Sequence, residues 1–224
     1  MNEIGLFEAI HTAKALRHLK PDPVPDELIV QVLDAAIRAP SGSNTQGWAF
    51  VVIKDPLRRA RIGAIYRRGG EVFNQIYRDR PRPEHMSEKS YARLLADARY
   101  LFEHMGEAPV LVLACLATAR RDAGRESSRP SPLAARLSGA SIYPAVQNII
   151  LACRGLGLGT VLTTLHAHFE DEVKAELGLP AEVETYALLP IGFPQDGFGF
   201  GPVRRKPLNQ VACLDHWGQR WPER

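Results

Sequence analysis

One stretch of this chain limits its fold more than any other. Residues 137–156 carry apolar or small side chains on nearly every face of a helix, among them Tyr143, Val146, Ile149 and Cys153. A helix that is apolar all round is buried on all sides. In a chain of 224 residues with 45% hydrophobic content, we expect this helix either at the centre of the core or in a subunit interface.

The apolar pattern predicts helices and strands mixed along one chain. Helical spacing and capping signals indicate helices at residues 2–16, 26–39, 57–65, 91–104, 137–156 and 169–177. Short apolar runs indicate strands at residues 49–53, 110–117, 160–165 and 184–191. No linker or repeat divides these elements, so we expect one α+β domain over residues 1–224.

Three segments between or after these elements differ from the rest. Residues 66–90 are the least regular, and they form either a lid that shapes a substrate site or a variable surface insertion. Residues 118–132 are polar and predict an exposed loop. Residues 192–224 include Trp217 and Trp221, so we expect this tail to pack on the body or on a partner subunit.

The overall composition excludes several classes of partner. A net charge of +3 with 24% charged residues is not typical of a nucleic-acid binder. The first residues lack the basic and apolar regions of a signal peptide, and no apolar run reaches the ~18 residues needed to cross a bilayer. The three cysteines lie far apart among apolar neighbours, which predicts reduced, buried thiols in a cytoplasmic protein.

The sequence also lacks the motifs of several common enzyme chemistries. It has no GxSxG nucleophile elbow and no phosphate-binding Walker sequence. The GLGLG run at residues 155–159 follows a helix and precedes a strand, which is the reverse of a dinucleotide-binding loop. His166 and His168 have no third ligand at a diagnostic spacing, so we expect ordinary histidines and no metal. Such a chain can obtain its chemistry from a cofactor.

Flavin mononucleotide (FMN) fits the polar residues that the sequence does offer. Its phosphate needs cations, which Lys14, Arg17 and Arg205 can supply. The pyrimidine edge of its ring needs short polar groups, which are dense at residues 41–44. Its reactive nitrogen needs a nearby backbone donor, which residues 162–164 can provide after the glycine run. An ordinary helix-to-strand loop at 41–46 is the alternative interpretation.

Six segments in the same order resemble the nitroreductase family of FMN-dependent oxidoreductases along nearly the whole chain. They are KALRHLKPDPVPDE, APSGSNTQGWAFVVIKDP, EAPVLVLA, AVQNIILACRGLGLGTVLTT, LLPIGFP and RRKPLNQV. The resemblance implies a central, mostly antiparallel sheet flanked by helices. It also implies an intertwined homodimer with FMN at the subunit interface, and NAD(P)H as the electron donor.

The family motifs assign cofactor contacts to particular positions of this chain. The implied FMN-binding residues are Lys14, Ala15, Arg17, Ser41, Gly42, Ser43, Asn44, Leu162, Thr163, Thr164 and Arg205. The family often has Arg where Lys14 stands and Ser where Ala15 stands, so one bidentate contact and one hydroxyl are lost.

Within the family, the segments are especially similar to the iodotyrosine deiodinase branch. That branch grips an amino-acid substrate with a Glu, a Tyr and a Lys. Glu71 can stand for the Glu, but Tyr77 is spaced too far from it and Phe102 occupies roughly the lysine position. The sequence therefore disfavours iodotyrosine, and we expect Glu71, Phe73 and Tyr77 to shape a different substrate site.

The sequence predicts an enzyme that reduces a flat electrophile, such as a nitroaromatic, a quinone or an enone, by a ping-pong two-electron mechanism. NAD(P)H and the acceptor would bind in turn at the same face of the FMN, and no side chain is needed as a catalytic acid or base. The alternatives are a flavin-binding or storage protein with little turnover, a reductive dehalogenase of a halophenol, and an interaction module without a cofactor.

Overall fold

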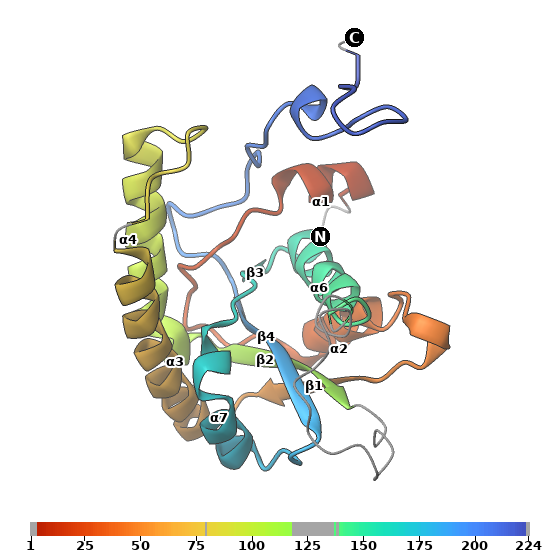
Figure 1. The fold of residues 1–224 in the computed structure, drawn as a ribbon. Coiled ribbons are helices and arrows are strands. Elements are labelled where there is room, and N and C mark those ends of the chain that lie inside the picture. Colours follow the sequence, from red (N-terminus) through yellow and green to blue (C-terminus); the bar gives the residue numbers. More distant parts are fainter. Residues whose placement is uncertain (1–3, 79, 118–136, 138, 223–224) are drawn as a thin grey trace.

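The computed structural model of the chain describes residues 4–78, 80–117, 137 and 139–222 (Figure 1). The helices are α1 (Leu6–Thr12), α2 (Asp26–Ala36), α3 (Pro56–Tyr77), α4 (Glu88–His104), α6 (Tyr143–Gly155) and α7 (Glu170–Leu177). The strands are β1 (Trp48–Ile53), β2 (Val110–Ala117), β3 (Gly159–Thr160) and β4 (Val183–Gly192). They form a sheet of order β1-β2-β4-β3 in which every neighbouring pair is antiparallel. The expected α+β fold with an antiparallel sheet is confirmed.

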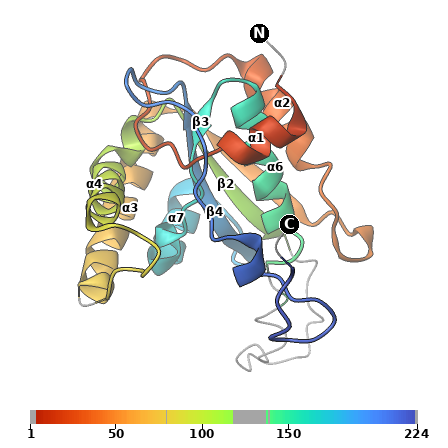
Figure 2. The same cartoon turned by 90° about the horizontal axis from the view of Figure 1, so that it is seen from above.

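Strand β2 is apolar on both faces and organises the core. Side chains alternate across a strand, so Val110 and Val112 enter one cluster with α2 and α6. Leu111 and Leu113 enter a second cluster with α3, α4 and α7. Figure 2 shows the sheet between these two groups of helices. Both faces of the sheet are therefore covered, as a continuous apolar strand requires.

Local signals set several of the helix ends. Pro25 precedes α2, and the Asp55 side chain caps α3 by accepting a 2.8 Å hydrogen bond from the Arg58 backbone N–H. Gly178 ends α7 with a φ of 66°, the left-handed conformation that glycine adopts without strain. The predicted start of α2 at residue 26 and the predicted end of α7 at residue 177 are confirmed.

The prediction of an irregular segment at residues 66–90 is wrong for most of its length. α3 continues from Pro56 to Tyr77, and α4 already begins at Glu88. Gly69 and Gly70 misled the sequence interpretation, because glycine usually weakens a helix. Here, close packing explains both: a Cβ on Gly69 would lie 2.6 Å from the Leu165 carbonyl oxygen, and one on Gly70 would lie 2.5 Å from the Phe102 ring.

Several other predictions need correction. The predicted helix at 137–156 is helical as α6 from Tyr143 to Gly155. Within one chain it buries one face and exposes Tyr143, so it is not enclosed by its own core, and the subunit interface stays a prediction. The predicted strand at 160–165 is the two-residue β3 followed by a single bridge at Thr163. Cys115 and Cys153 are buried as expected, but Cys213 is exposed. The loop expected at 118–132 lies outside the described residues.

The first part of the tail packs on the body. The Lys20 N–H donates to the Phe193 carbonyl, and the Val203 N–H donates to the His11 carbonyl. Beyond these contacts the tail leaves the body, and Trp217 is 99% exposed (blue in Figure 1). Within the described residues, no helix is both long and apolar enough to cross a membrane.

Candidate functional site

A cavity of about 880 Å³ gathers most of the predicted cationic residues. It is lined by Lys14, Ala15 and Arg17 from the segment after α1, by Leu162 after β3, and by Arg205 from the tail. These residues are distant in sequence, and backbone hydrogen bonds bring them together. The most direct are Leu16 N–H to the Thr160 carbonyl (3.0 Å) and Val203 N–H to the His11 carbonyl (2.9 Å).

The polar groups of this cationic cavity fit an anionic, hydrogen-bonding ligand. Thr160 lines the cavity, and its hydroxyl is buried and has no hydrogen-bond partner in the described structure. A buried hydroxyl without a partner is costly, so a ligand oxygen or nitrogen here would relieve that cost. Burial lowers the pKa of Arg17, an effect that the nearby carboxylate of Asp97 partly opposes. A bound anion would stabilise this desolvated guanidinium.

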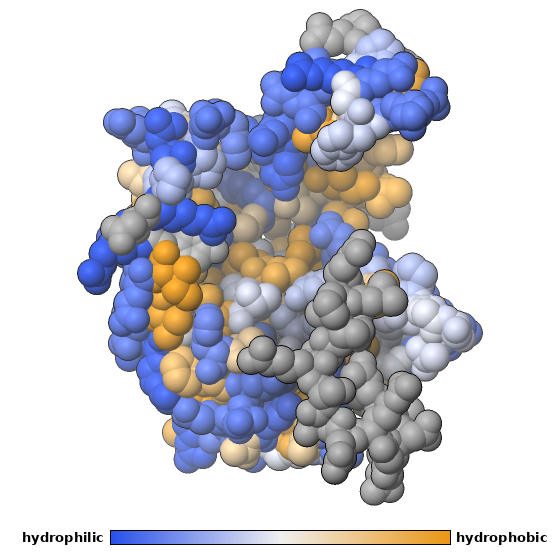
Figure 3. Space-filling model, in the orientation of Figure 1, coloured by the Kyte–Doolittle hydropathy of each residue, from blue (hydrophilic) through white to orange (hydrophobic). Residues whose placement is uncertain are grey.

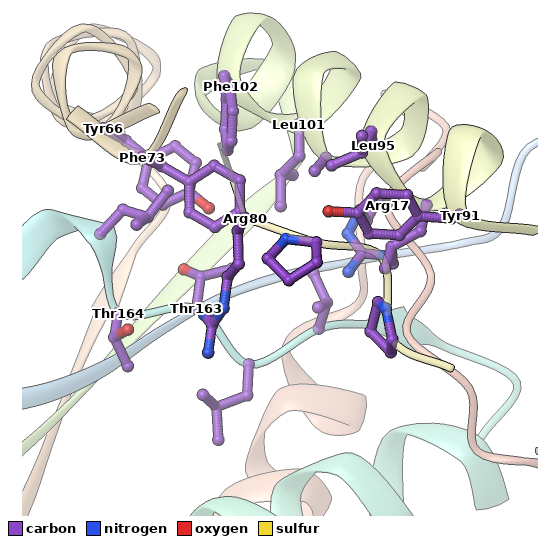
Figure 4. A pocket seen from close by; sticks show the side chains of 17 residues that line it. Arg17, Tyr66, Phe73, Arg80, Tyr91, Leu95, Leu101, Phe102, Thr163 and Thr164 are labelled. Atoms are coloured by element: carbon purple, nitrogen blue, oxygen red, sulfur yellow. The ribbon is translucent and has the colours of Figure 1, made fainter. Parts of the chain in front are cut away.

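A second cavity, of about 510 Å³, adjoins the first and is largely aromatic and aliphatic. The two cavities share Arg17, Val161 and Leu162 as lining residues. Its floor holds an aromatic cluster in which the Phe73 and Phe102 rings meet edge to face, with centroids 5.7 Å apart. Figure 4 shows these rings together with Arg80 and Tyr91 around the cavity.

Tyr66 is a polar residue among the aromatic side chains that line this cavity. Its side chain is buried in α3, and burial raises the pKa of its hydroxyl to about 12, against the smaller opposing effects of a hydrogen bond with Thr163 and the charge of Arg17. The hydroxyl is therefore neutral at physiological pH. Thr163 itself is fixed to β4, because its hydroxyl donates a 2.7 Å hydrogen bond to the Leu188 carbonyl.

The predicted loop at residues 41–44 lines neither cavity in its own chain. It is ordered by its own contacts: the Gln46 N–H donates to the Ser41 hydroxyl (3.0 Å), and the Gly42 N–H donates to the Ser141 hydroxyl (3.1 Å). Ser43 and Asn44 both have φ near +50°, which is uncommon for residues other than glycine. Such strained conformations gather at functional sites, and here the side chains of Ser43 and Asn44 are exposed.

The predicted substrate residues meet different outcomes. Phe73 lines the aromatic cavity, whereas Glu71 is exposed and does not line it. Tyr77 ends α3, and its side chain lies outside the described part of the chain. Thr164 lines the same cavity as Phe73.

Sequence reasoning missed many lining residues of the two cavities, among them Tyr66, Arg80, Tyr91 and Thr160. Tyr66 could have been found from the apolar periodicity of α3, had the helix been extended through its glycines. Arg80 gave no signal of its own, because it is one of several arginines in that region.

His166 lies directly behind the loop of Thr163 and Thr164, in a short 3-10 helix, η3 (Leu165–Phe169). Its ring is fully buried, and neither nitrogen has a hydrogen-bond partner in the described structure. His168 is exposed. No group of three or more potential metal ligands occurs among the described residues. Burial lowers the pKa of His166 to about 4, and the negative charge of Glu170 opposes this shift only partly.

These features together define a class of protein. A layered α+β fold places three cations around one cavity and an aromatic cavity beside it, and neither cavity is lined by a cysteine or a histidine pair. Such an arrangement is typical of a protein that holds a planar, phosphorylated cofactor and a flat second ligand.

Comparisons with known proteins agree with this class. A model of the nitroreductase family matches residues 10–193. Iodotyrosine deiodinase 1 of Rattus norvegicus is 27% identical over 94% of this chain and 70% of its own length. NADH dehydrogenase of Thermus thermophilus is 30% identical over 89% of this chain and 90% of its own. The crystal structure of an iodotyrosine deiodinase bound to FMN and 3-iodo-L-tyrosine superposes with a TM-score of 0.68 at 25% identity, covering 95% of this chain and 99% of that one.

The chain therefore belongs to the nitroreductase family, and it is an oxidoreductase of that family.

The buried His166 leads to a prediction about stability and pH. Its folded pKa of about 4 lies below the ordinary value of 6.5, so the unfolded chain takes up a proton first as the pH falls. Folding stability is therefore highest above pH 6.5 and falls between pH 6.5 and 4 by about 2–3 kcal/mol from this group. His166→Leu should flatten this dependence in urea unfolding measured across that range.

His168→Leu is the matched control, because His168 is exposed two residues away. It should keep the pH dependence of the wild type. An unchanged slope in His166→Leu would contradict the assignment of a neutral buried imidazole.

Proposed function

We propose that the cationic cavity binds FMN. Lys14, Arg17 and Arg205 would neutralise its phosphate, and the partnerless Thr160 hydroxyl would gain a hydrogen bond. The observation that carries this proposal is the convergence of three cations from two distant segments on one cavity whose lining residue Thr160 has a buried, unsatisfied hydroxyl. A relative with the same fold is bound to FMN in its crystal structure.

The adjoining aromatic cavity would receive the substrates. When bound, FMN would take two electrons from NAD(P)H and pass them to a flat acceptor such as a nitroaromatic, a quinone or an enone. Phe73 and Phe102 would stack against or border the acceptor ring, and Tyr66 would stay neutral beside it. Val161 and Leu162 line both cavities, so an acceptor and the cofactor ring would meet beside them.

An anaerobic absorbance titration tests this function. Protein loaded with FMN should bleach when NADPH or NADH is added and regain its colour when a nitroaromatic follows. A yellow protein that neither nicotinamide bleaches would favour flavin storage over turnover. A colourless protein that takes up no added FMN would overturn the proposal.

Arg205 should contribute to FMN retention. Arg205→Ala removes a charge-assisted contact to phosphate worth roughly 1.5–3 kcal/mol, so the dissociation constant for FMN should rise by about ten- to a hundredfold. Arg204→Ala is the matched control, because Arg204 is the exposed neighbour that does not line the cavity. Flavin fluorescence titration measures the dissociation constant for FMN in both variants. Equal values for the two would contradict the assignment of Arg205.

We also propose that the active form is a homodimer. α1 exposes the apolar side chains of Leu6 and Phe7, and the tail exposes Trp217. Figure 3 shows apolar side chains at the surface near α1 and in the hollow beside it. In a dimer, the loop at residues 41–44, which lines neither cavity of its own chain, would complete the cavity of the partner. Its preformed, strained backbone supports this role.

A mixing experiment tests the dimer and the loop together. Asn44→Ala and Arg205→Ala should each form a dimer of about twice 24.8 kDa by light scattering and should each bind FMN weakly. If the loop acts across the interface, co-refolding the two variants should restore about a quarter of the sites to full affinity. If it acts within its own chain, or if the protein is a monomer, the mixture should contain no restored site.

Reductive dehalogenation of a halophenol is the second candidate function. It is favoured by the iodotyrosine deiodinases among the relatives. The aryl halide would take two electrons and one proton and release halide. Iodotyrosine itself is disfavoured, since Phe102 occupies the expected lysine position and Glu71 lies off the cavity. Halide release that outpaces nitro reduction would support this candidate over the first.

A further inference from the structure

The aromatic cavity has an unequal distribution of charge. Its charged lining residues are Arg17 and Arg80, and its described lining includes no carboxylate and no lysine. The other polar side chains are the hydroxyls of tyrosine and threonine. Among the described lining residues, a cationic ligand group would therefore find no opposite charge. An anionic group would meet the guanidinium group of Arg80, since Arg17 is assigned to the FMN phosphate.

The position of Arg80 follows from the end of α3. The helix ends at Tyr77, and Arg80, Pro81 and Pro83 before α4 line the cavity. Pro81 and Pro83 restrict the backbone next to Arg80, because proline fixes φ. Figure 4 shows Arg80 at the cavity between the aromatic cluster and the segment of Thr163 and Thr164. Arg17 lies on the other side of the same cavity, near Tyr91 (Figure 4).

The aromatic floor also depends on a glycine. The Phe102 ring lies where a side chain on Gly70 would project, since a Cβ there would be 2.5 Å from that ring. Phe102 in turn contacts Tyr66, with centroids 6.1 Å apart, and Phe73. This side of the cavity is therefore formed by aromatic rings without a charged group. Such a surface suits an aromatic ligand but provides no partner for an ammonium group.

We propose that this cavity selects an aromatic electron acceptor that carries an anionic group, such as a carboxylate, and that Arg80 is the residue that determines this specificity. The acceptor ring would lie against Phe73 and Phe102, with the anion toward Arg80. The acceptor role rests on the proposed function, whereas the charge preference rests on the lining residues. Arginine is suited to this contact, because its planar group can donate two parallel hydrogen bonds to one carboxylate.

The matching reaction can be written for 4-nitrobenzoate. The nitro group takes two electrons and two protons, loses one oxygen as water and becomes a nitroso group. NAD(P)H supplies both electrons as a hydride and so becomes NAD(P)+, and the second proton comes from solvent. The carboxylate is unchanged, so Arg80 acts on binding and not on the chemical step.

A binding experiment tests the charge preference without requiring turnover. Isothermal titration of the purified full chain, with FMN added, would compare 4-nitrobenzoate, neutral 4-nitrobenzamide and cationic 4-nitrobenzylamine. We expect the benzoate to bind about tenfold more tightly than the amide, and the benzylamine to bind most weakly. Arg80 is exposed, so the preference should shrink as the salt concentration rises.

Variants of Arg80 sharpen the test. Arg80→Gln should remove the preference for the benzoate and leave amide binding unchanged, and Arg80→Glu should favour the benzylamine. Arg78→Gln is the matched control, because Arg78 is an exposed arginine two residues away that does not line the cavity. It should behave like the wild type. Equal binding of benzoate and amide by the wild type, or equal effects of Arg78→Gln and Arg80→Gln, would overturn the proposal.

This outcome is separable from the proposed function. If the benzoate is preferred but reduced flavin never passes electrons to it, the charge preference stands and the oxidoreductase assignment for this cavity fails. If neutral nitroaromatics are reduced without any benzoate preference, the oxidoreductase assignment stands and the role of Arg80 fails. If the benzoate is both preferred and reduced, Arg80→Gln should raise KM for the benzoate and leave kcat little changed in steady-state measurements.

Discussion

The burial of β2 on both faces is the constraint on which the rest of the structure depends. A strand with apolar residues at every position cannot lie at a surface, so helices must cover both faces of the sheet. α2 and α6 cover one face, and α3, α4 and α7 cover the other. Both cavities form beside this core, in the part of the molecule where chain segments from different layers meet.

Backbone hydrogen bonds then turn sequence-distant segments into one site. The segment after α1 lies between β3 and the tail, with Leu16 bonded to Thr160 and His11 bonded to Val203. Gly159 permits this approach, because a Cβ there would lie 2.7 Å from the Leu19 side chain. The cationic side chains of the cavity therefore project from backbone segments that these hydrogen bonds position. Binding therefore requires little reordering of the main chain.

The sequence predicted the parts of this molecule that local chemistry decides. The bounds of β2 followed from its apolar run, and the cap at Gly178 followed from the residue itself. The cations of the first cavity were predicted because phosphate recognition needs a known residue type. Phe73, Thr163 and Thr164 of the aromatic cavity were predicted as site residues, but its lining residues from α4 and from the connection before it were not. The glycines of α3 are explained only by Leu165 and Phe102, which are distant in sequence.

The two cavities differ in the chemistry that they offer to a ligand. The cationic cavity offers the positive charges that any phosphorylated planar cofactor would need. Backbone hydrogen bonds position the segments that line it. The aromatic cavity is lined by core side chains of α3 and α4, and by Arg80, Pro81 and Pro83, which belong to neither core cluster. Substitutions there can change the charge and shape offered to a second ligand with little effect on the sheet. The charge of the aromatic cavity can therefore change at the exposed Arg80 without a change in the core or in the cationic cavity.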